Sequence, residues 1–144
     1  MEKLKVNPYI VTNGNGGEVI EFYKKVFDAE VIGVQTFGQM PASPDMPIPD
    51  EAKNRIAHAM FKIGESEIML SDTFPGNPFQ LGDQLNLCIM ADDKEQAKRY
   101  YDALQEGGKV DMPLQETFWS PAYGIVTDKF GVTFQISTAG KDHQ

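Results

Sequence analysis

The hydrophobic positions of this chain follow the same order of spacings twice. From Tyr9 to Val31, an alternating run, a polar turn, helically spaced apolar residues and a second apolar run follow one another. The stretch from Leu87 to Val110 repeats this order. Each stretch therefore predicts a strand, a helix and a second strand, and two or three further strand-like runs follow each of them.

The two predicted helices align at an offset of 77 residues. This offset gives four matched pairs: Glu18 with Glu95, Ile20 with Ala97, Tyr23 with Tyr100, and Phe27 with Leu104. Two similar halves in one chain of 144 residues indicate paired modules. Paired modules favour a shared cleft in which small molecules bind.

The first module is expected to span about residues 4–72. Its pattern predicts a strand at 4–12, a turn at 13–17, a helix at 18–27, a strand at 31–37, and a hairpin of strands at 56–63 and 66–71. The tight turn Gly64-Glu65 joins the two hairpin strands. That turn predicts three facing pairs: Ile63 with Ser66, Met60 with Met69, and His58 with Ser71.

The second module is expected to span about residues 84–138, after a linker at 73–83 that is rich in proline and glycine. Its pattern predicts a strand at 84–90, a helix capped by Asp92 or Asp93 that runs to Gln105, and strands at 110–119, 124–127 and 132–137. The chain is thus expected to be a single α+β domain, residues 1–144, made of two β-α-β-β-β modules. The segment 38–50 carries four prolines, which indicates an irregular loop long enough to act as a flap.

Composition and charge exclude some classes of protein. The net charge is −8, with 13 basic residues scattered among 21 acidic ones, and this disfavours nucleic acid as a partner. The sequence contains no apolar run near the roughly 20 residues that a membrane-spanning helix needs. Its first residues lack the apolar core of a signal peptide. We therefore expect a cytoplasmic protein with no membrane partner.

The single cysteine, Cys88, lies in the apolar run Leu87-Cys88-Ile89-Met90. One cysteine forms no disulfide within the chain. Free cysteine behaves as a small hydrophobic residue, so the run favours a buried core position over a nucleophile.

Several segments, in this order and spacing, resemble one known family. They are Asn7-Pro8-Tyr9-Ile10, the helix 20–27, the segments 58–66 and 69–72, Phe118-Trp119, Tyr123-Gly124, and the turn 128–131. Together they resemble the vicinal-oxygen-chelate superfamily of glyoxalase I, bleomycin-resistance proteins and extradiol dioxygenases. The resemblance is to its PhnB-like branch, often labelled "3-demethylubiquinone methyltransferase-like". It implies that the two modules form a curved mixed sheet around a cleft.

In the metal-using members of that superfamily, four ligands, typically His, Gln or Glu, come from the first and last strands of each module. Aligned strand ends put Asn7, Met69, Asn86 and Gln135 at these positions. These residues make a poor divalent-metal site, because zinc and the hard cations prefer carboxylate, thiolate or imidazole ligands. The resemblance therefore implies no metal and no other cofactor, and it leaves a divalent-metal enzyme as a disfavoured alternative.

The glycine-rich segment 13–17 invites comparison with a nucleotide-binding loop. It does not match the G-x-G-x-x-G pattern, because Val19 occupies the third glycine position. A plain turn is favoured, and literal methyltransferase activity is disfavoured because nothing else indicates a nucleoside cofactor.

Two polar residues are candidates for chemistry. His58 is either a hydrogen-bonded wall residue of its strand or a ligand contact that transfers protons, since imidazole serves as acid or base near neutral pH. Asp72 is either a turn residue at a strand end or a carboxylate at the mouth of the cleft.

Aromatic and sulfur-containing residues are candidates for the cleft wall. Phe118, Trp119 and Tyr123 form the densest aromatic cluster, which suits either core packing or a pocket. Met40, Met46, Met60 and Met69 suit either a soft lining or ordinary core filling. The residues expected to line the cleft are Asn7, Tyr9, Met60, Met69, Ser71, Asn86, Trp119, Tyr123 and Gln135.

These observations favour a homodimer that binds a small, largely apolar molecule in a metal-free cleft, with His58 as the candidate catalytic residue. One alternative is a metal-dependent lyase, isomerase or dioxygenase of the same superfamily. A second alternative is a non-catalytic dimeric scaffold whose cleft is vestigial.

Overall fold

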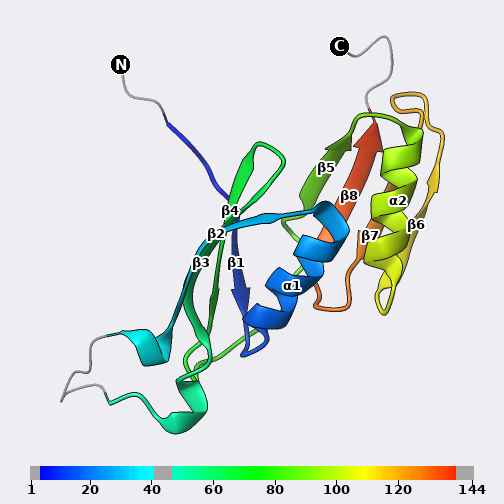
Figure 1. Ribbon diagram of the computed structural model, residues 1–144. Helices are drawn as coiled ribbons and strands as arrows, with labels where there is room; N and C mark the ends of the chain where they lie inside the picture. The colour runs from blue at the N-terminus through cyan, green and yellow to red at the C-terminus, as the bar shows by residue number, and fades with distance from the viewer. Residues whose placement is uncertain (1–3, 41–46, 139–144) are drawn as a thin grey trace. The chain divides into compact units, whose positions relative to one another are not determined.

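The computed structural model describes residues 4–40 and 47–138, and the chain divides into two compact units, Met1–Gln80 and Leu81–Gln144 (Figure 1). Both units contain β-α-β-β-β in chain order, which confirms the two predicted modules. The prediction that the two modules form a single domain stays a prediction. None of the helices in the described segments is long and apolar enough to cross a membrane.

The first unit is a four-stranded mixed sheet with one long helix. Its elements are β1 (Tyr9–Thr12), α1 (Gly16–Phe27), β2 (Glu30–Thr36), β3 (Ile56–Ile63) and β4 (Ser66–Asp72). The strand order is β1-β4-β3-β2, with β1 parallel to β4 and the other neighbours antiparallel. The predicted hairpin register is confirmed, because Met60 pairs with Met69 and Ile63 with Ser66.

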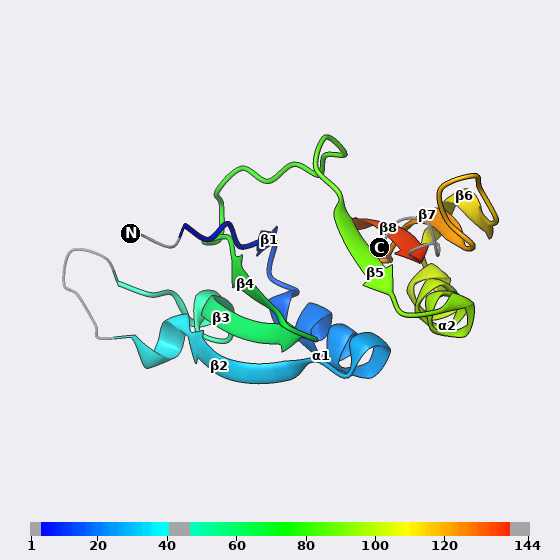
Figure 2. The ribbon, with the colours of Figure 1, turned by 90° about the horizontal axis from the view of Figure 1, so that it is seen from above.

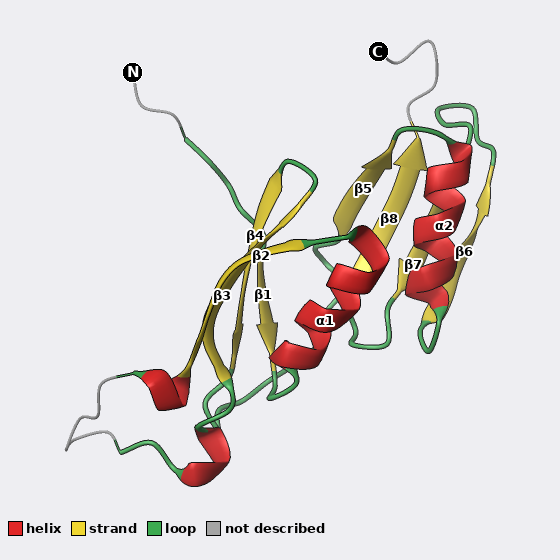
Figure 3. Ribbon diagram, in the orientation of Figure 1, coloured by secondary structure: helices red, strands yellow, loops and turns green. Residues whose placement is uncertain are grey.

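The second unit repeats this topology. Its elements are β5 (Leu87–Ala91), α2 (Lys94–Gln105), β6 (Lys109–Gln115), β7 (Tyr123–Thr127) and β8 (Thr133–Thr138). The strand order is β5-β8-β7-β6, again with one parallel pair at the edge (Figure 3). The pairs Tyr9–Met69 and Cys88–Gln135 occupy equivalent places in the two sheets.

Each helix covers one face of the sheet in its own unit (Figure 2). In the first unit the ring of Tyr23 lies 6.1 Å from that of Phe61, and both side chains are buried. In the second unit Tyr101 and Phe134 are buried on the helix-covered side. Because side chains alternate along a strand, the residues between these core positions lie on the opposite face, here called the open face.

Burial corrects the predicted alignment of the two helices. The buried positions Val19, Tyr23 and Val26 of α1 correspond to the buried Ala97, Tyr101 and Leu104 of α2, an offset of 78 rather than 77 residues. The predicted partner of Tyr23 was Tyr100, which is only half-buried. The sequence alone does not distinguish the two offsets, because Tyr100 and Tyr101 are adjacent and either offset aligns a tyrosine with Tyr23.

The ends of the elements differ from the predictions in several places. β1 begins at Tyr9 rather than Leu4, after Pro8, which has no N–H to donate to a sheet. Helix α1 begins at Gly16 rather than Glu18. Asp93 caps α2, and its side chain accepts a hydrogen bond from the backbone N–H of Gln96 at 2.8 Å.

The predicted loop at 38–50 contains more order at its ends than expected. Short 3-10 helices lie at Phe37–Gln39 and Asp50–Ala52. Backbone bonds from Phe37 to Arg55 and from Gly38 to Lys53, both 3.0 Å, tie the first of these to the chain before β3. Residues 41–46, with Met46, lie outside the described residues, so the flap stays a prediction.

Candidate functional site

The open face of the first sheet brings together most of the site residues predicted in that module. Tyr9 pairs with Met69 across the β1–β4 ladder, and Met69 pairs with Met60 across the hairpin. Ser71 follows Met69 on the same face, and His58 precedes Met60 on the same face. The predicted His58, Met60, Met69 and Tyr9 therefore form one continuous row of neighbours.

His58 is exposed, and its ring centroid lies 6.1 Å from that of Tyr9. No described residue forms a hydrogen bond with its imidazole, and both predicted roles, a wall residue of its strand or a ligand contact that transfers protons, stay predictions. Helix α1 packs on the opposite face of this sheet.

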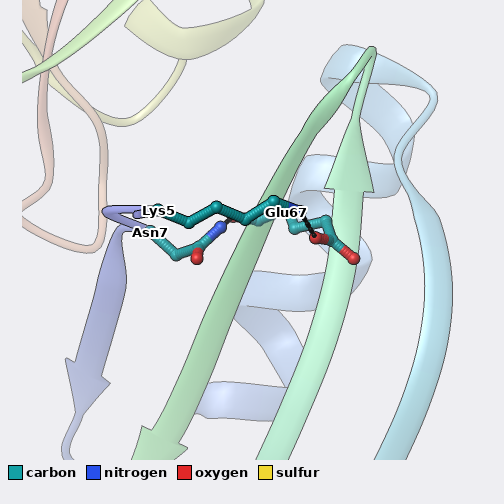
Figure 4. Close-up of polar contacts among 3 residues, drawn as sticks. All are labelled: Lys5, Asn7 and Glu67. Carbon is teal, nitrogen blue, oxygen red and sulfur yellow. Dashed lines mark hydrogen bonds and ion pairs between the residues drawn. The ribbon is translucent and has the colours of Figure 1, made fainter. Parts of the chain in front are cut away.

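Asn7 lies just before β1 and is held to the edge of β4 (Figure 4). Its side-chain Nδ2 donates to the backbone carbonyl of Glu67 at 3.1 Å. The ammonium of Lys5 lies 3.4 Å from the Glu67 carboxylate and strengthens the same attachment. The Asn7 amide thus fastens the N-terminal segment to the sheet, a role that the sequence did not indicate.

Asp72 differs from both predictions for it. Its side chain is buried on the helix-covered side, where Oδ1 accepts bonds from Thr12 Oγ1 at 2.6 Å and from the N–H groups of Gly14 and Gly16 at 2.8 and 2.9 Å. Oδ2 accepts from the N–H of Ile56 at 2.7 Å. The carboxylate therefore ties the β1–α1 loop to the start of β3, and it does not stand at the mouth of an open face.

In the second sheet, three predicted residues form one hydrogen-bonded chain. Tyr123 donates through its hydroxyl to Oε1 of Gln135 at 2.7 Å. Gln135 in turn donates through Nε2 to Oδ1 of Asn86 at 3.2 Å. Asn86 and Gln135, two of the four residues predicted at metal-ligand positions, are thus bonded directly to each other.

Two further aromatic rings, those of Trp119 and Phe118, lie beside Tyr123. The ring of Trp119 lies 5.2 Å from that of Tyr123 and 4.7 Å from that of Phe118, both in edge-to-face contact. Phe118 is 94% exposed and Trp119 is 39% exposed. The prediction of core packing is therefore wrong for these two residues, because β6 ends at Gln115 and the rings stand on the loop before β7.

Cys88 is exposed, which corrects the prediction of a buried core residue. It lies on the open face, where it pairs with Gln135 across the β5–β8 ladder, and its Sγ lies 3.7 Å from Sδ of Met90. Partial burial raises the pKa of the thiol above its ordinary value. The apolar run 87–90 favoured a buried position, but Cys88 and Met90 are both exposed on the open face of β5.

We expect the Cys88 thiol to react slowly and completely with iodoacetamide in the native protein. The residue is exposed, so the reagent reaches it, but the raised pKa leaves little thiolate, which is the reactive form. At about pH 8, alkylation of Cys88 should be slower than alkylation of glutathione. Its rate should still increase when the pH is raised beyond about 9. Mass spectrometry of the intact chain measures it, and a rate at neutral pH equal to that of glutathione would contradict this account of the thiol.

The chemistry of the four predicted ligand residues decides whether they could hold a divalent metal ion. Asn7, Met69, Asn86 and Gln135 supply amide and thioether groups, without carboxylate, imidazole or thiolate. Oε1 of Gln135 already accepts a hydrogen bond from Tyr123, and Oδ1 of Asn86 already accepts one from Gln135. Within residues 4–40 and 47–138, no group of three or more His, Cys, Asp and Glu side chains could hold a metal ion. These residues do not fit a metal of the superfamily type.

Sequence reasoning missed a second polar chain in this unit. Thr127 donates to the Asp111 carboxylate at 2.7 Å and shares a hydrogen bond of 2.9 Å with Thr133. Lys109 lies 3.3 Å from the same carboxylate. The bond to Thr127 lowers the pKa of Asp111 despite partial desolvation. The alternation of Lys109 with Asp111 was the available signal, since alternate residues of a strand share a face.

Comparison with known proteins identifies the family. The chain is 36% identical over 143 residues to protein YjdN of Escherichia coli (strain K12), covering 93% of this chain and 95% of YjdN. The structure of PA1353 from Pseudomonas aeruginosa is 32% identical, with a TM-score of 0.84 over 95% of this chain and 98% of that one.

A third protein shares the fold at lower identity. It is a putative 3-demethylubiquinone-9 3-methyltransferase, PhnB protein, from Bacillus cereus, with 22% identity, a TM-score of 0.78, and coverage of 94% of this chain and 100% of that one. The family model for the Glyoxalase/Bleomycin resistance protein/Dioxygenase superfamily matches residues 5–136. The chain is a member of the glyoxalase/bleomycin resistance protein/dioxygenase superfamily.

Proposed function

We propose that this protein binds a small, largely apolar molecule in a metal-free cleft lined by open-face residues. The observation that carries the proposal is the Asn86–Gln135–Tyr123 chain, in which two of the four predicted ligand residues, Asn86 and Gln135, are neutral amides that hydrogen-bond to each other. The exposed rings of Phe118 and Trp119 support an apolar ligand, since aromatic walls beside a few polar groups are typical of small-molecule sites.

Thioether and imidazole side chains on the first sheet support the same proposal. Met60 and Met69 are half-buried neighbours on the open face, and thioether side chains adapt to ligands of different shape. His58 is the candidate for any proton transfer, because its imidazole is exposed beside Tyr9. We propose further that the protein is a cytoplasmic homodimer and that nucleic acid is not a partner, which the net charge of −8 supports.

A thermal-shift screen of a metabolite library tests the proposed binding. A ligand that binds only the folded state raises the apparent stability, so at least one compound should raise the melting temperature by several degrees. Trp119→Ala should abolish most of that shift, because it removes the central ring of the aromatic wall. His58→Ala reports whether the first sheet contributes to the same ligand.

Tyr100→Ala provides the matched control, since this aromatic residue lies on α2 and away from the open face. It should lower the melting temperature of the free protein without changing the shift caused by the ligand. If no compound stabilises the wild type, the proposed binding fails and the dimeric scaffold with a vestigial cleft is supported. A shift that requires a divalent ion would instead support the metal-dependent lyase, isomerase or dioxygenase.

A further inference from the structure

We propose that Tyr123 selects ligands that carry a hydrogen-bond donor, because its hydroxyl oxygen is held as an acceptor beside the Trp119 ring. The inference rests on the proposed function and names the ligand class for the second sheet: an uncharged planar aromatic molecule with a hydroxyl or N–H group.

The direction of the hydrogen-bond chain follows from its anchor on the backbone. Nδ2 of Asn86 donates to the carbonyl oxygen of Asp83 at 3.3 Å, and a backbone carbonyl can only accept. Oδ1 of Asn86 therefore faces Gln135, whose Nε2 donates to it at 3.2 Å. Because Nε2 of Gln135 faces Asn86, its Oε1 faces Tyr123. The bonds at both ends therefore fix the Gln135 amide in one of its two possible orientations.

The Tyr123 hydroxyl is the outer end of this chain. Its proton is committed to Oε1 of Gln135 at 2.7 Å, which leaves the lone pairs of the phenolic oxygen to accept. Within the described segments of the chain, no side chain or backbone N–H donates to that oxygen. A ligand donor such as a hydroxyl or an N–H would complete its hydrogen bonding, whereas a ligand acceptor would meet another acceptor.

The aromatic cluster places an apolar wall next to this oxygen. The Trp119 ring stands edge-to-face to Tyr123 at 5.2 Å and is partly exposed, so a planar ligand can pack against it while reaching the hydroxyl. A carboxylate ligand is disfavoured, because it would bring a negative charge against the Tyr123 lone pairs in a chain of net charge −8.

Matched biphenyls test the inference on the full chain. The probes are 4-hydroxybiphenyl, 4-methoxybiphenyl and biphenyl-4-carboxylate, which differ only in the group offered to Tyr123. Trp119 is the sole tryptophan, so its indole N–H gives a single resonance in a nitrogen–proton correlation spectrum. Titrations should show the hydroxy compound binding roughly fivefold to tenfold more tightly than the methoxy compound, with the carboxylate weakest.

Three variants test whether the hydrogen bond to Tyr123 causes the preference. Tyr123→Phe should remove the preference for the hydroxy compound, whereas Tyr100→Phe on α2 should keep it. Asn86→Leu removes the anchor that fixes the Gln135 amide and should also weaken the preference. The spectrum itself shows whether each variant is folded.

The possible outcomes distinguish this inference from the proposed function. Equal affinities for the hydroxy and methoxy compounds, or a preference that survives in Tyr123→Phe, would overturn donor selection while leaving the proposed binding intact. If none of the three probes shifts the Trp119 resonance, aromatic binding at this face is excluded and both proposals fail for the second sheet.

Discussion

Replacing Asp72 with alanine is expected to lower the free energy of unfolding by about 4 kcal/mol. The change removes the acceptor of the buried N–H groups of Gly16 and Ile56 and of the partly buried N–H of Gly14. The Thr12 hydroxyl loses a bond of 2.6 Å and keeps the backbone carbonyl of Ser71, at 3.2 Å, as its other acceptor. A buried donor that loses its partner incurs its full desolvation penalty, so the loss exceeds that of an ordinary surface hydrogen bond. Urea denaturation followed by far-ultraviolet circular dichroism measures the effect.

Two companion variants make the Asp72 result interpretable. Asp72→Asn keeps the oxygen that accepts three bonds but turns an NH₂ group toward the N–H of Ile56, so it should cost about half as much, roughly 2 kcal/mol. Asp102→Ala removes an exposed carboxylate that pairs with Lys98 on α2 and should change stability by less than about 0.5 kcal/mol. A loss of under about 1 kcal/mol in Asp72→Ala would refute the tethering role.

Tyr101→Ala is expected to cost about 4 kcal/mol, whereas Tyr100→Ala should cost about 1 kcal/mol or less. Tyr101 is 4% exposed, packs beneath β7, and donates through its hydroxyl to the backbone carbonyl of Met112 at 2.9 Å. Burial, with the charges of Asp111 and Asp102, raises the pKa of its phenol. Tyr100 lies half-exposed beside Arg99.

This pair of variants tests the alignment of the two halves. The offset of 78 residues matches Tyr101 to the buried Tyr23, and the offset of 77 would match Tyr100 to it. Thermal and urea unfolding of the two variants are compared under the same conditions. Equal losses, or a larger loss in Tyr100→Ala, would contradict the corrected alignment.

Local patterns predicted the secondary structure well where neighbours in the sequence decide it. The hairpin of β3 and β4 follows from a two-residue turn, and the cap of α2 follows from Asp93 three residues before Gln96. The start of α1 depends instead on Asp72, which is distant in the sequence and reaches back to Gly14 and Gly16. Sequence periodicity contains no signal for such a contact.

The sequence indicated some neighbours in the candidate site and missed its hydrogen bonds. The hairpin turn predicted that Met60 faces Met69, which the register confirms, while Gln135 was chosen by the family resemblance and Tyr123 by its aromatic cluster. The sequence did not predict that Gln135 bonds to both Asn86 and Tyr123, because that chain depends on side-chain geometry across three segments. Cys88 was misplaced because an apolar run looks the same whether one face of the strand is covered or both.

The central claim is our proposal that the amide and thioether side chains at the four predicted ligand positions, Asn7, Met69, Asn86 and Gln135, hold no divalent metal ion. Elemental analysis of the full chain, purified without chelators, tests this claim most directly. We predict that manganese, iron, nickel, zinc and magnesium will each be present far below one ion per chain. A stoichiometric amount of any one of them would contradict the claim.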